Sequence, residues 1–273
     1  MPDLTLRSQM AHARGRLAVG DPRSAVAVGR RILETYPRCV AAYALLGEAL
    51  LQLGRLDRAQ DLLLRAWGAC PETASVCLAL AAIAGQRGET AVARAWREQA
   101  GDLLPEGGRE APEPPAGAPF RGCQPLMPLT RTSLARLWLR QGLAARAARE
   151  LRALLAEQPG RYDVQVTLAE ALWRAGAEAE AARLSQEIVA AHPHCLKALL
   201  ILGKRRLHGE QDAQARRWLL DAQALDPENR LAQELFGADT PLPPRTARLP
   251  YRDKELPPLE LPYGDDEDDG ELD

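Results

Sequence analysis

The chain has 273 residues, of which 46% are hydrophobic, 4% are aromatic and 26% are charged, and its net charge is −2. This apolar content excludes a chain that is disordered throughout, and the low aromatic content favours closely packed helices rich in alanine and leucine over a β-sandwich. No apolar run has the length of a membrane span, and residues 1–10 lack a secretory pattern. The five cysteines are odd in number and irregularly spaced, which argues for a reducing compartment, so we expect a cytoplasmic protein.

Charge is divided unevenly along the chain. No basic residue follows Lys254, whereas nine of the 37 acidic residues do. The body of the protein is therefore mildly basic, and its last part is strongly acidic.

Prolines recur every 34 residues in two series, Pro37–Pro71–Pro105 and Pro159–Pro193–Pro227. The step from Pro105 to Pro159 is one such period plus 20 residues. A period of this length predicts a repeat array, in which each unit packs on its neighbours and no central core is needed.

Each period has the same internal pattern, which is clearest before Pro71. Apolar and small residues follow helical spacing from Tyr43 to Leu50, Gly54 interrupts them, and the spacing resumes from Ala59 to Ala66. This pattern predicts two helices joined by a tight turn. Glycine suits the turn because the residue after a helix often needs left-handed backbone angles. The turn glycine recurs in register as Gly20, Gly54, Gly88, Gly142 and Gly176, and one place early as Gly209.

The period resembles the tetratricopeptide repeat (TPR), a helical hairpin with an aromatic-x2-Leu-Gly first helix, an alanine-led second helix and a closing proline. The resemblance covers roughly residues 3–237 and implies an all-α solenoid of about six hairpins. Asp226, in the run that closes the last full repeat, is expected to cap the helix that follows.

The predicted organisation has four parts. Residues 1–105 form an N-terminal group of three repeats, and residues 129–237 form a second group of three repeats with a capping helix. Residues 106–128 between them are a linker rich in proline and glycine. Residues 238–273 are a Pro-rich acidic tail, expected to be disordered because it cannot bury enough apolar surface. Whether the two groups stack continuously across the linker is left open by the sequence.

Metal binding and catalysis find little support in the sequence. His192, His194 and Cys195 are the one constellation that looks like metal ligands, but a zinc site normally needs a second cluster and no Cys-x2-Cys pair exists. The cysteines near repeat junctions have no evident histidine partner and are interpreted as small buried hydrophobes. No phosphate-binding loop or serine elbow is present. We therefore expect no cofactor, no metal and no enzymatic activity.

The TPR resemblance implies that the first helix of each hairpin lines a concave groove that holds a peptide or a partner helix. Projected onto this sequence, the groove positions of the first group include Met10, Arg14, Glu48 and Gln52. Those of the second group include Arg136, Arg140, Val166, Glu170, Trp173 and Lys204. Trp173 is the first candidate to carry binding energy, and packing against the neighbouring repeat is the equal alternative. Asn229 is the sole asparagine, which argues against the asparagine-based carboxylate clamp of some TPR domains.

These features predict a non-catalytic scaffold or adaptor that binds a protein or peptide partner in the groove. The acidic tail could compete with an acidic ligand, dock on another protein through Leu249–Tyr251 and Leu261–Tyr263, or only aid solubility. The alternative function is nucleic-acid association through the arginines of the second half, such as Arg146, Arg149 and Arg205. Interspersed glutamates and the few aromatic residues favour solvated helix faces instead.

Overall fold

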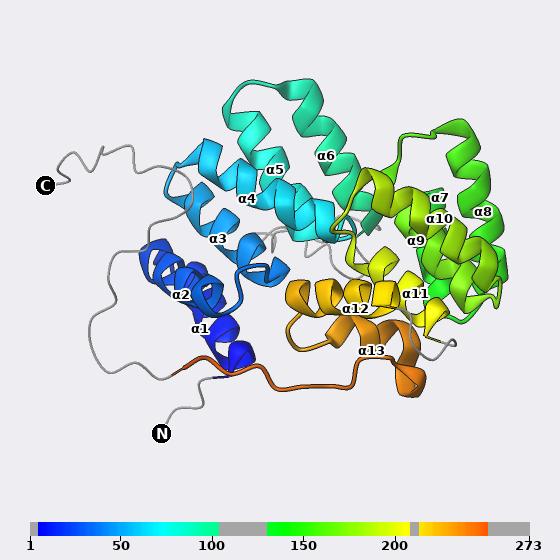
Figure 1. The fold of residues 1–273 in the computed structure, drawn as a ribbon. Coiled ribbons are helices and arrows are strands. Elements are labelled where there is room, and N and C mark those ends of the chain that lie inside the picture. The colour runs from blue at the N-terminus through cyan, green and yellow to red at the C-terminus, as the bar shows by residue number, and fades with distance from the viewer. Residues whose placement is uncertain (1–4, 104–129, 208–212, 251–273) are drawn as a thin grey trace, which may run out of the picture.

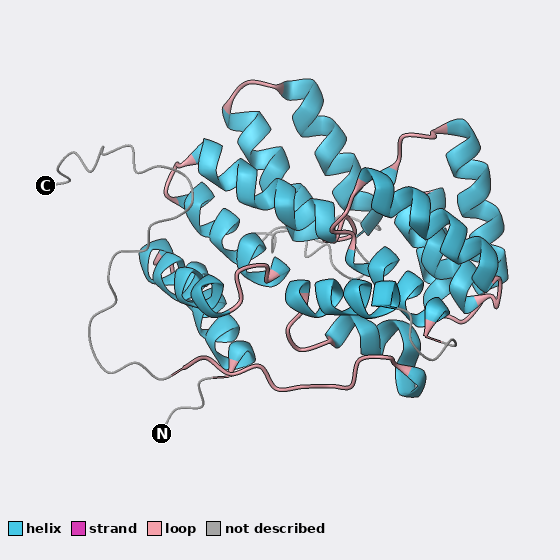
Figure 2. Ribbon diagram, viewed as in Figure 1, coloured by secondary structure: helices cyan, strands magenta, loops and turns pink. Residues whose placement is uncertain are grey.

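The computed structural model describes residues 5–103, 130–207 and 213–250. The predicted linker, Gly209 and residues 251–273 of the predicted tail lie outside these ranges. Within them the chain forms thirteen α-helices and one short 3-10 helix, with a single isolated β-bridge between Thr5 and Arg248 (Figures 1 and 2). None of the described helices combines the length and the apolar character that crossing a bilayer requires.

The helices pair into six hairpins, three on each side of residues 104–129, as the sequence predicted. The first repeat group consists of α1 (Leu6–Ala18), α2 (Pro22–Thr35), α3 (Val40–Gln52), α4 (Leu56–Ala69), α5 (Ala74–Gln86) and α6 (Thr90–Leu103). The second repeat group consists of α7 (Arg131–Arg140), α8 (Ala144–Glu157), α9 (Tyr162–Arg174), α10 (Glu178–Ala191), α11 (Leu196–Arg206) and α12 (Ala213–Leu225). A short helix α13 (Arg230–Phe236) and the 3-10 turn η1 (Gly237–Asp239) follow.

The turns of the hairpins confirm the role predicted for their glycines. Gly20, Gly54, Gly88, Gly142 and Gly176 all have φ between 73° and 80°, a left-handed conformation that other residues adopt at a cost. Asp226 also acts as predicted, because its carboxylate accepts a hydrogen bond from the N–H of Leu231 in the first turn of α13, at 2.9 Å.

Small residues let the two helices of a hairpin approach closely. A Cβ atom added to Gly47 of α3 would lie 2.5 Å from Cγ of Leu63 in α4, and Leu63 is fully buried. Because the branched end of Leu63 cannot move into solvent, the glycine is required by packing.

The two repeat groups fold back on each other, so that their repeat junctions meet along a line that we call the seam (Figure 1). Three contacts follow one another along it in antiparallel order. Arg38 pairs with Asp221 at 2.7 Å, Glu72 pairs with Lys197, and Asp102 pairs with Arg161 at 2.8 Å. The array therefore turns sharply at the linker, and the first and last repeats come together.

Aromatic packing fills the middle of the seam. Trp67 of α4 makes edge-to-face contacts with Trp96 of the first group and with Tyr162 of the second, at centroid distances of 5.3 and 5.2 Å. The Tyr162 hydroxyl donates a hydrogen bond to the carbonyl oxygen of Gly68 at 2.7 Å. Apolar burial and a hydrogen bond thus join the groups at the same place.

A buried ion cluster lies beside these rings. The Lys197 ammonium contacts the carboxylates of both Glu72 and Glu170, and Glu72 also accepts a hydrogen bond from the Thr167 hydroxyl at 2.6 Å. Burial opposes ionisation of Glu72, but the attraction of Lys197 and Arg136 is greater and lowers the pKa of Glu72. Burial likewise opposes the charge of Lys197, and the two glutamates outweigh it and raise the pKa of Lys197.

The first part of the predicted tail is ordered in this structure. Residues 241–250, which we call the strap, run from the end of the second group to α1 and α2 (the orange segment of Figure 1). Ala247 and Leu249 are buried in the core of the first hairpin. The expectation of disorder therefore does not hold for the strap, because these two side chains give it apolar surface to bury.

We expect Gly47→Ala to destabilise the protein by about 1–3 kcal/mol, because the added methyl group overpacks the contact with Leu63. The free energy of unfolding from denaturant titration measures the effect. The matched control is Gly15→Ala in α1, where an added Cβ meets nothing within 4 Å. That change should stabilise the chain by about 0.5–1 kcal/mol through helix propensity. Equal effects of the two substitutions would contradict the packing argument.

We expect Lys197→Met to lower the free energy of unfolding by about 3–5 kcal/mol at neutral pH, because it removes the cation that pairs with the carboxylate of Glu72 and leaves Glu170 with Arg174 alone. The control is Arg94→Met, which breaks a pair with Glu98 on an exposed helix face. This control should cost about 0.5 kcal/mol or less.

The same substitution has a pH signature. In the native protein the lowered pKa of Glu72 stabilises the fold above that group's ordinary value of 4.5, and the contribution is lost as the pH falls through the folded pKa. The raised pKa of Lys197 stabilises the fold below 10.5, and that contribution is lost as the pH rises through its folded pKa. The penalty of Lys197→Met should therefore shrink in acid, where the carboxylate of Glu72 is protonated. A penalty that is constant down to the acid transition would contradict the assignment.

Candidate functional site

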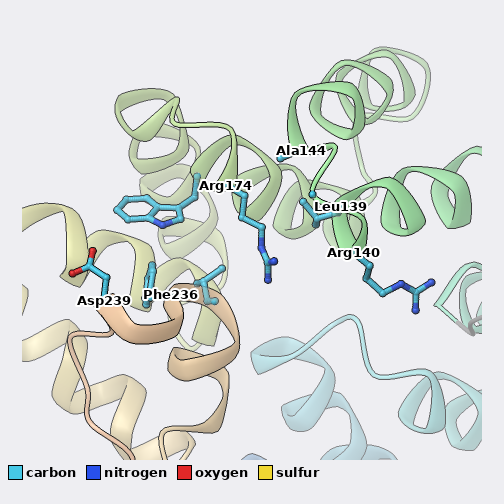
Figure 3. Close-up of a pocket in the computed structure, with 9 residues that line it drawn as sticks. Leu139, Arg140, Ala144, Arg174, Phe236 and Asp239 are labelled. Carbon is cyan, nitrogen blue, oxygen red and sulfur yellow. The ribbon is translucent and has the colours of Figure 1, made fainter.

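A cleft lies on the concave side of the second repeat group, where the carboxyl ends of α7 and α9 face α13. It consists of two adjoining cavities of about 360 and 200 Å³ that share Leu139, Arg140 and Arg174. Figure 3 shows Arg140 and Arg174 extending from α7 and α9 in the same direction, with Phe236 and Asp239 of the α13–η1 segment on the Arg174 side. The cleft exists because α13, in the place of a seventh first helix, closes the end of the array.

The larger cavity is apolar on one side. Trp173 and Phe236 pack edge to face with their ring centroids 5.4 Å apart, and Leu139 and Leu235 complete this wall. Lys204 lies at its edge and pairs with the exposed carboxylate of Asp239 at 2.8 Å. The Arg174 guanidinium donates a hydrogen bond to the carbonyl oxygen of Glu234 and so holds α13 against α9.

The smaller cavity is polar and ends at the seam. Its lining includes the ion cluster of Glu72, Lys197 and Glu170, and Thr167 beside it. Glu170 also pairs with Arg174 at 2.8 Å. The charges at this end are therefore largely neutralised by one another.

The side chain of Arg136, a predicted groove residue, is taken up by contacts within the protein. Its side chain is only 12% exposed and pairs with Asp163 at 3.3 Å, and it also donates to the main-chain oxygen of Asp102 across the seam at 3.0 Å. Arg161 pairs with the same two aspartates. Replacing Arg136 would leave Asp163, which is almost fully buried, without one of its two cations.

Arg140 differs from the other cations of the cleft. It is exposed and lines both cavities, and its side chain forms no ion pair or hydrogen bond with any other residue in the described ranges. A guanidinium in this state presents all its donors to a ligand and binds carboxylates or phosphates in two-point contacts. Among the cleft cations in the part of the chain that the structure describes, it is therefore the one available for recognition.

The structure brings together only some of the predicted groove residues. Arg136, Arg140, Glu170 and Trp173 line the cleft, with Lys204 at its edge, whereas Val166 is buried in the core of the second group.

The four predicted residues of the first group do not line the cleft. Met10 is buried in the core of the first hairpin, and Arg14 and Gln52 are exposed. Glu48 is half-buried, and burial raises the pKa of its carboxyl group.

Residues outside the groove pattern complete the cleft, namely Glu72, Leu139, Arg174, Lys197, Leu235, Phe236 and Asp239. Arg174 follows the predicted Trp173 directly and could have been included on that ground. Glu72 and Lys197 could not, because their contact joins positions 125 residues apart.

The histidines and cysteines near the repeat junctions serve packing. His192 stacks on Tyr162 with a centroid distance of 3.7 Å, and His194 lies 3.0 Å from the Arg38 guanidinium. No cluster of three potential metal ligands occurs in residues 5–103, 130–207 and 213–250. Burial raises the pKa of the Cys39 thiol to about 11 and that of the Cys77 thiol to about 12, which disfavours the reactive thiolate.

Two family models, both described as a tetratricopeptide repeat, match the chain over residues 16–84 and 132–193. A comparison with curated proteins finds no match. Each matched range falls within one repeat group and includes hairpins whose turn glycines are left-handed.

Several solved structures are similar at low identity. A tetratricopeptide repeat protein from Parabacteroides merdae is 16% identical, with 84% of this chain and 96% of that chain covered and a TM-score of 0.36. YrrB, described as a TPR protein with an unusual peptide-binding site, is 14% identical, with coverage of 76% and 96% and a TM-score of 0.34. PilF of Pseudomonas aeruginosa is 16% identical, with coverage of 84% and 95% and a TM-score of 0.33.

The family matches and the hairpins lead to the same conclusion. Stacked repeats of this kind present extended concave surfaces to other proteins, so the chain is in general terms a scaffold for protein–protein interaction. Both of its repeat groups contain tetratricopeptide repeats.

Proposed function

We propose that this protein is a non-catalytic scaffold that binds an extended segment of a protein partner in the cleft between α7, α9 and α13. The single observation that carries the proposal is Arg140, an exposed cation with no acidic partner in the described ranges, located between an apolar cavity and a polar one. Binding sites combine such apolar walls with a few placed polar groups.

The chemistry of the cleft indicates which segment fits. A cavity of about 360 Å³ between Trp173, Phe236 and Leu139 has room for a large apolar side chain, and Arg140 beside it can pair with a carboxylate. A segment with both groups a few residues apart can reach both features. Burial of aromatic and arginine side chains is also the commonest source of binding energy in protein interfaces.

A protein partner is better supported than a nucleic acid. Several arginines of the second group form ion pairs within the protein, as Arg131 does with Glu150 and Glu157 and Arg152 does with Glu180. Neutralised arginines contribute little to the phosphate attraction on which nucleic-acid binding depends.

The four cysteines in the described ranges are free thiols, which supports a reducing compartment and hence the cytoplasm.

We expect Arg140→Glu to lose partner binding, because it reverses the available charge of the cleft and repels a carboxylate. Affinity capture with the full-length chain, followed by quantitative mass spectrometry, measures the loss. The captured amount of any partner that binds this cleft should fall at least about tenfold, which corresponds to about 1.4 kcal/mol or more of binding free energy.

The matched control is Arg149→Glu, on the outer helix α8, where the arginine is also exposed. This variant makes the same change in net charge away from the cleft and should retain the partners. If both variants capture the same proteins in the same amounts, the partner binds elsewhere and the proposal is wrong.

A further inference from the structure

The strap occupies a defined binding site on α1 and α2. The N–H of Leu6 donates a hydrogen bond to the carbonyl oxygen of Ala247 at 2.8 Å. The Tyr36 hydroxyl donates to the carbonyl oxygen of Arg248 at 2.9 Å, and Arg31 donates to that of Pro250 at 3.0 Å. Leu249, only 4% exposed, inserts its side chain into the core of this hairpin.

This site recognises an extended main chain and one leucine. All three hydrogen bonds go to carbonyl oxygens of the strap, which every residue possesses. The specific element is the leucine followed by proline, which fixes an extended conformation before binding. Any segment with this element in the same register can therefore make the same contacts.

The chain contains a second segment of this kind. Leu-Pro-Tyr-x-Asp occurs at residues 249–253 and again at 261–265, twelve residues further on. The second proline falls in the same register, and Leu261, like Leu249, retains its N–H group. We call residues 247–253 the first unit and residues 259–265 the second unit.

The basic charge of the α1–α2 surface favours binding of the second unit, whereas the size of the buried side chain favours binding of the first. Residues 5–36, which include α1 and α2, carry six arginines and two acidic residues. The first unit brings Arg248 to this basic surface, and the second unit has Glu260 at the corresponding position. In contrast, the fully buried Ala247 corresponds to the larger Leu259, which prevents the second unit from displacing the first completely.

We propose that the surface of α1 and α2 is a docking site for Leu-Pro-Tyr-x-Asp segments, and that the second unit of the same chain exchanges with the first on it. The exchange adds twelve residues to the connection between the two ends of the array. The occupant belongs to the same chain because a tethered segment has a far higher effective concentration than a second copy.

Photocrosslinking of the full-length protein tests the exchange. Tyr36→p-benzoyl-L-phenylalanine places a reactive ketone where the hydroxyl contacts the strap, and trypsin separates the products. Because no lysine or arginine follows Lys254, residues 255–273 leave as one peptide that contains the second unit. We expect adducts with both units, and the adduct with residues 255–273 should increase at least threefold in a Leu249→Asp background.

Two substitutions in the tail are the controls, and neither affects the described core. Leu261→Asp should abolish the adduct with residues 255–273, whereas Leu256→Asp, outside the unit, should leave it unchanged. High salt should weaken this adduct, because the basic surface attracts Glu260 through screened charges.

Three results would overturn the proposal. The first is the absence of any adduct with residues 255–273 in the Leu249→Asp background. The second is equal loss of that adduct in the Leu261→Asp and Leu256→Asp variants. The third is an adduct that joins heavy and light chains in a mixture of isotopically labelled and unlabelled protein, since the occupant would then be a second copy.

Discussion

The ammonium group of Lys197 lies between the carboxylates of Glu72 and Glu170, in a part of the molecule where all three side chains are largely withdrawn from water. Transferring these charges from water is costly, and their mutual contact, with the Thr167 hydroxyl on Glu72 and Arg174 on Glu170, offsets that cost. The contact fixes the start of α11 against the junction between the second and third repeats. The position of α9, and with it the polar end of the cleft, depends on this arrangement.

Charge along the seam also explains its register. From one end to the other, the junctions of the first group present Arg38, Glu72 and Asp102, and they meet Asp221, Lys197 and Arg161. A slip of one repeat in one direction would bring Arg38 against Lys197, and a slip in the other would bring Glu72 against Asp221. Since like charges in partly buried positions repel strongly, the observed register is the one in which every junction is paired.

Whether the sequence predicts a structural feature depends on how far apart the interacting residues lie along the chain. Gly54 and Gly176 lie at the predicted turns because a left-handed residue recurs with each hairpin. Gly47 lies where two helices touch, and its spacing in the sequence shows this. The pairing of Glu72 with Lys197 has no such signal, because it depends on a turn of the whole array at the linker, and a periodic pattern contains no information about that turn.

The strap shows where a prediction of disorder from composition fails. A stretch with many prolines has little apolar surface, and disorder is the reasonable prediction. Two side chains, those of Ala247 and Leu249, are enough to order it here because α1 and α2 offer a preformed site. The average composition of a stretch contains no information about a contact made by two of its residues.

The fold-back also changes what a concave face can do. In an open superhelix the first helices keep their side chains for a partner, but here Arg136, Glu170 and Lys204 pair with Asp163, Lys197 and Asp239 within the chain. What is left for a ligand is Arg140 and the apolar wall that Trp173 shares with Phe236.

That wall depends on α13, a helix of only seven residues, which is too short to be stable without tertiary contacts. It is held by Trp173 through Phe236 and by Arg174 through Glu234, residues of the same cleft. A partner that contacts Trp173 therefore acts on the contacts that position α13. In the proposed binding mode, occupancy of the cleft is therefore coupled to the position of the last helix, because Trp173 and Arg174 line the cleft and also hold α13.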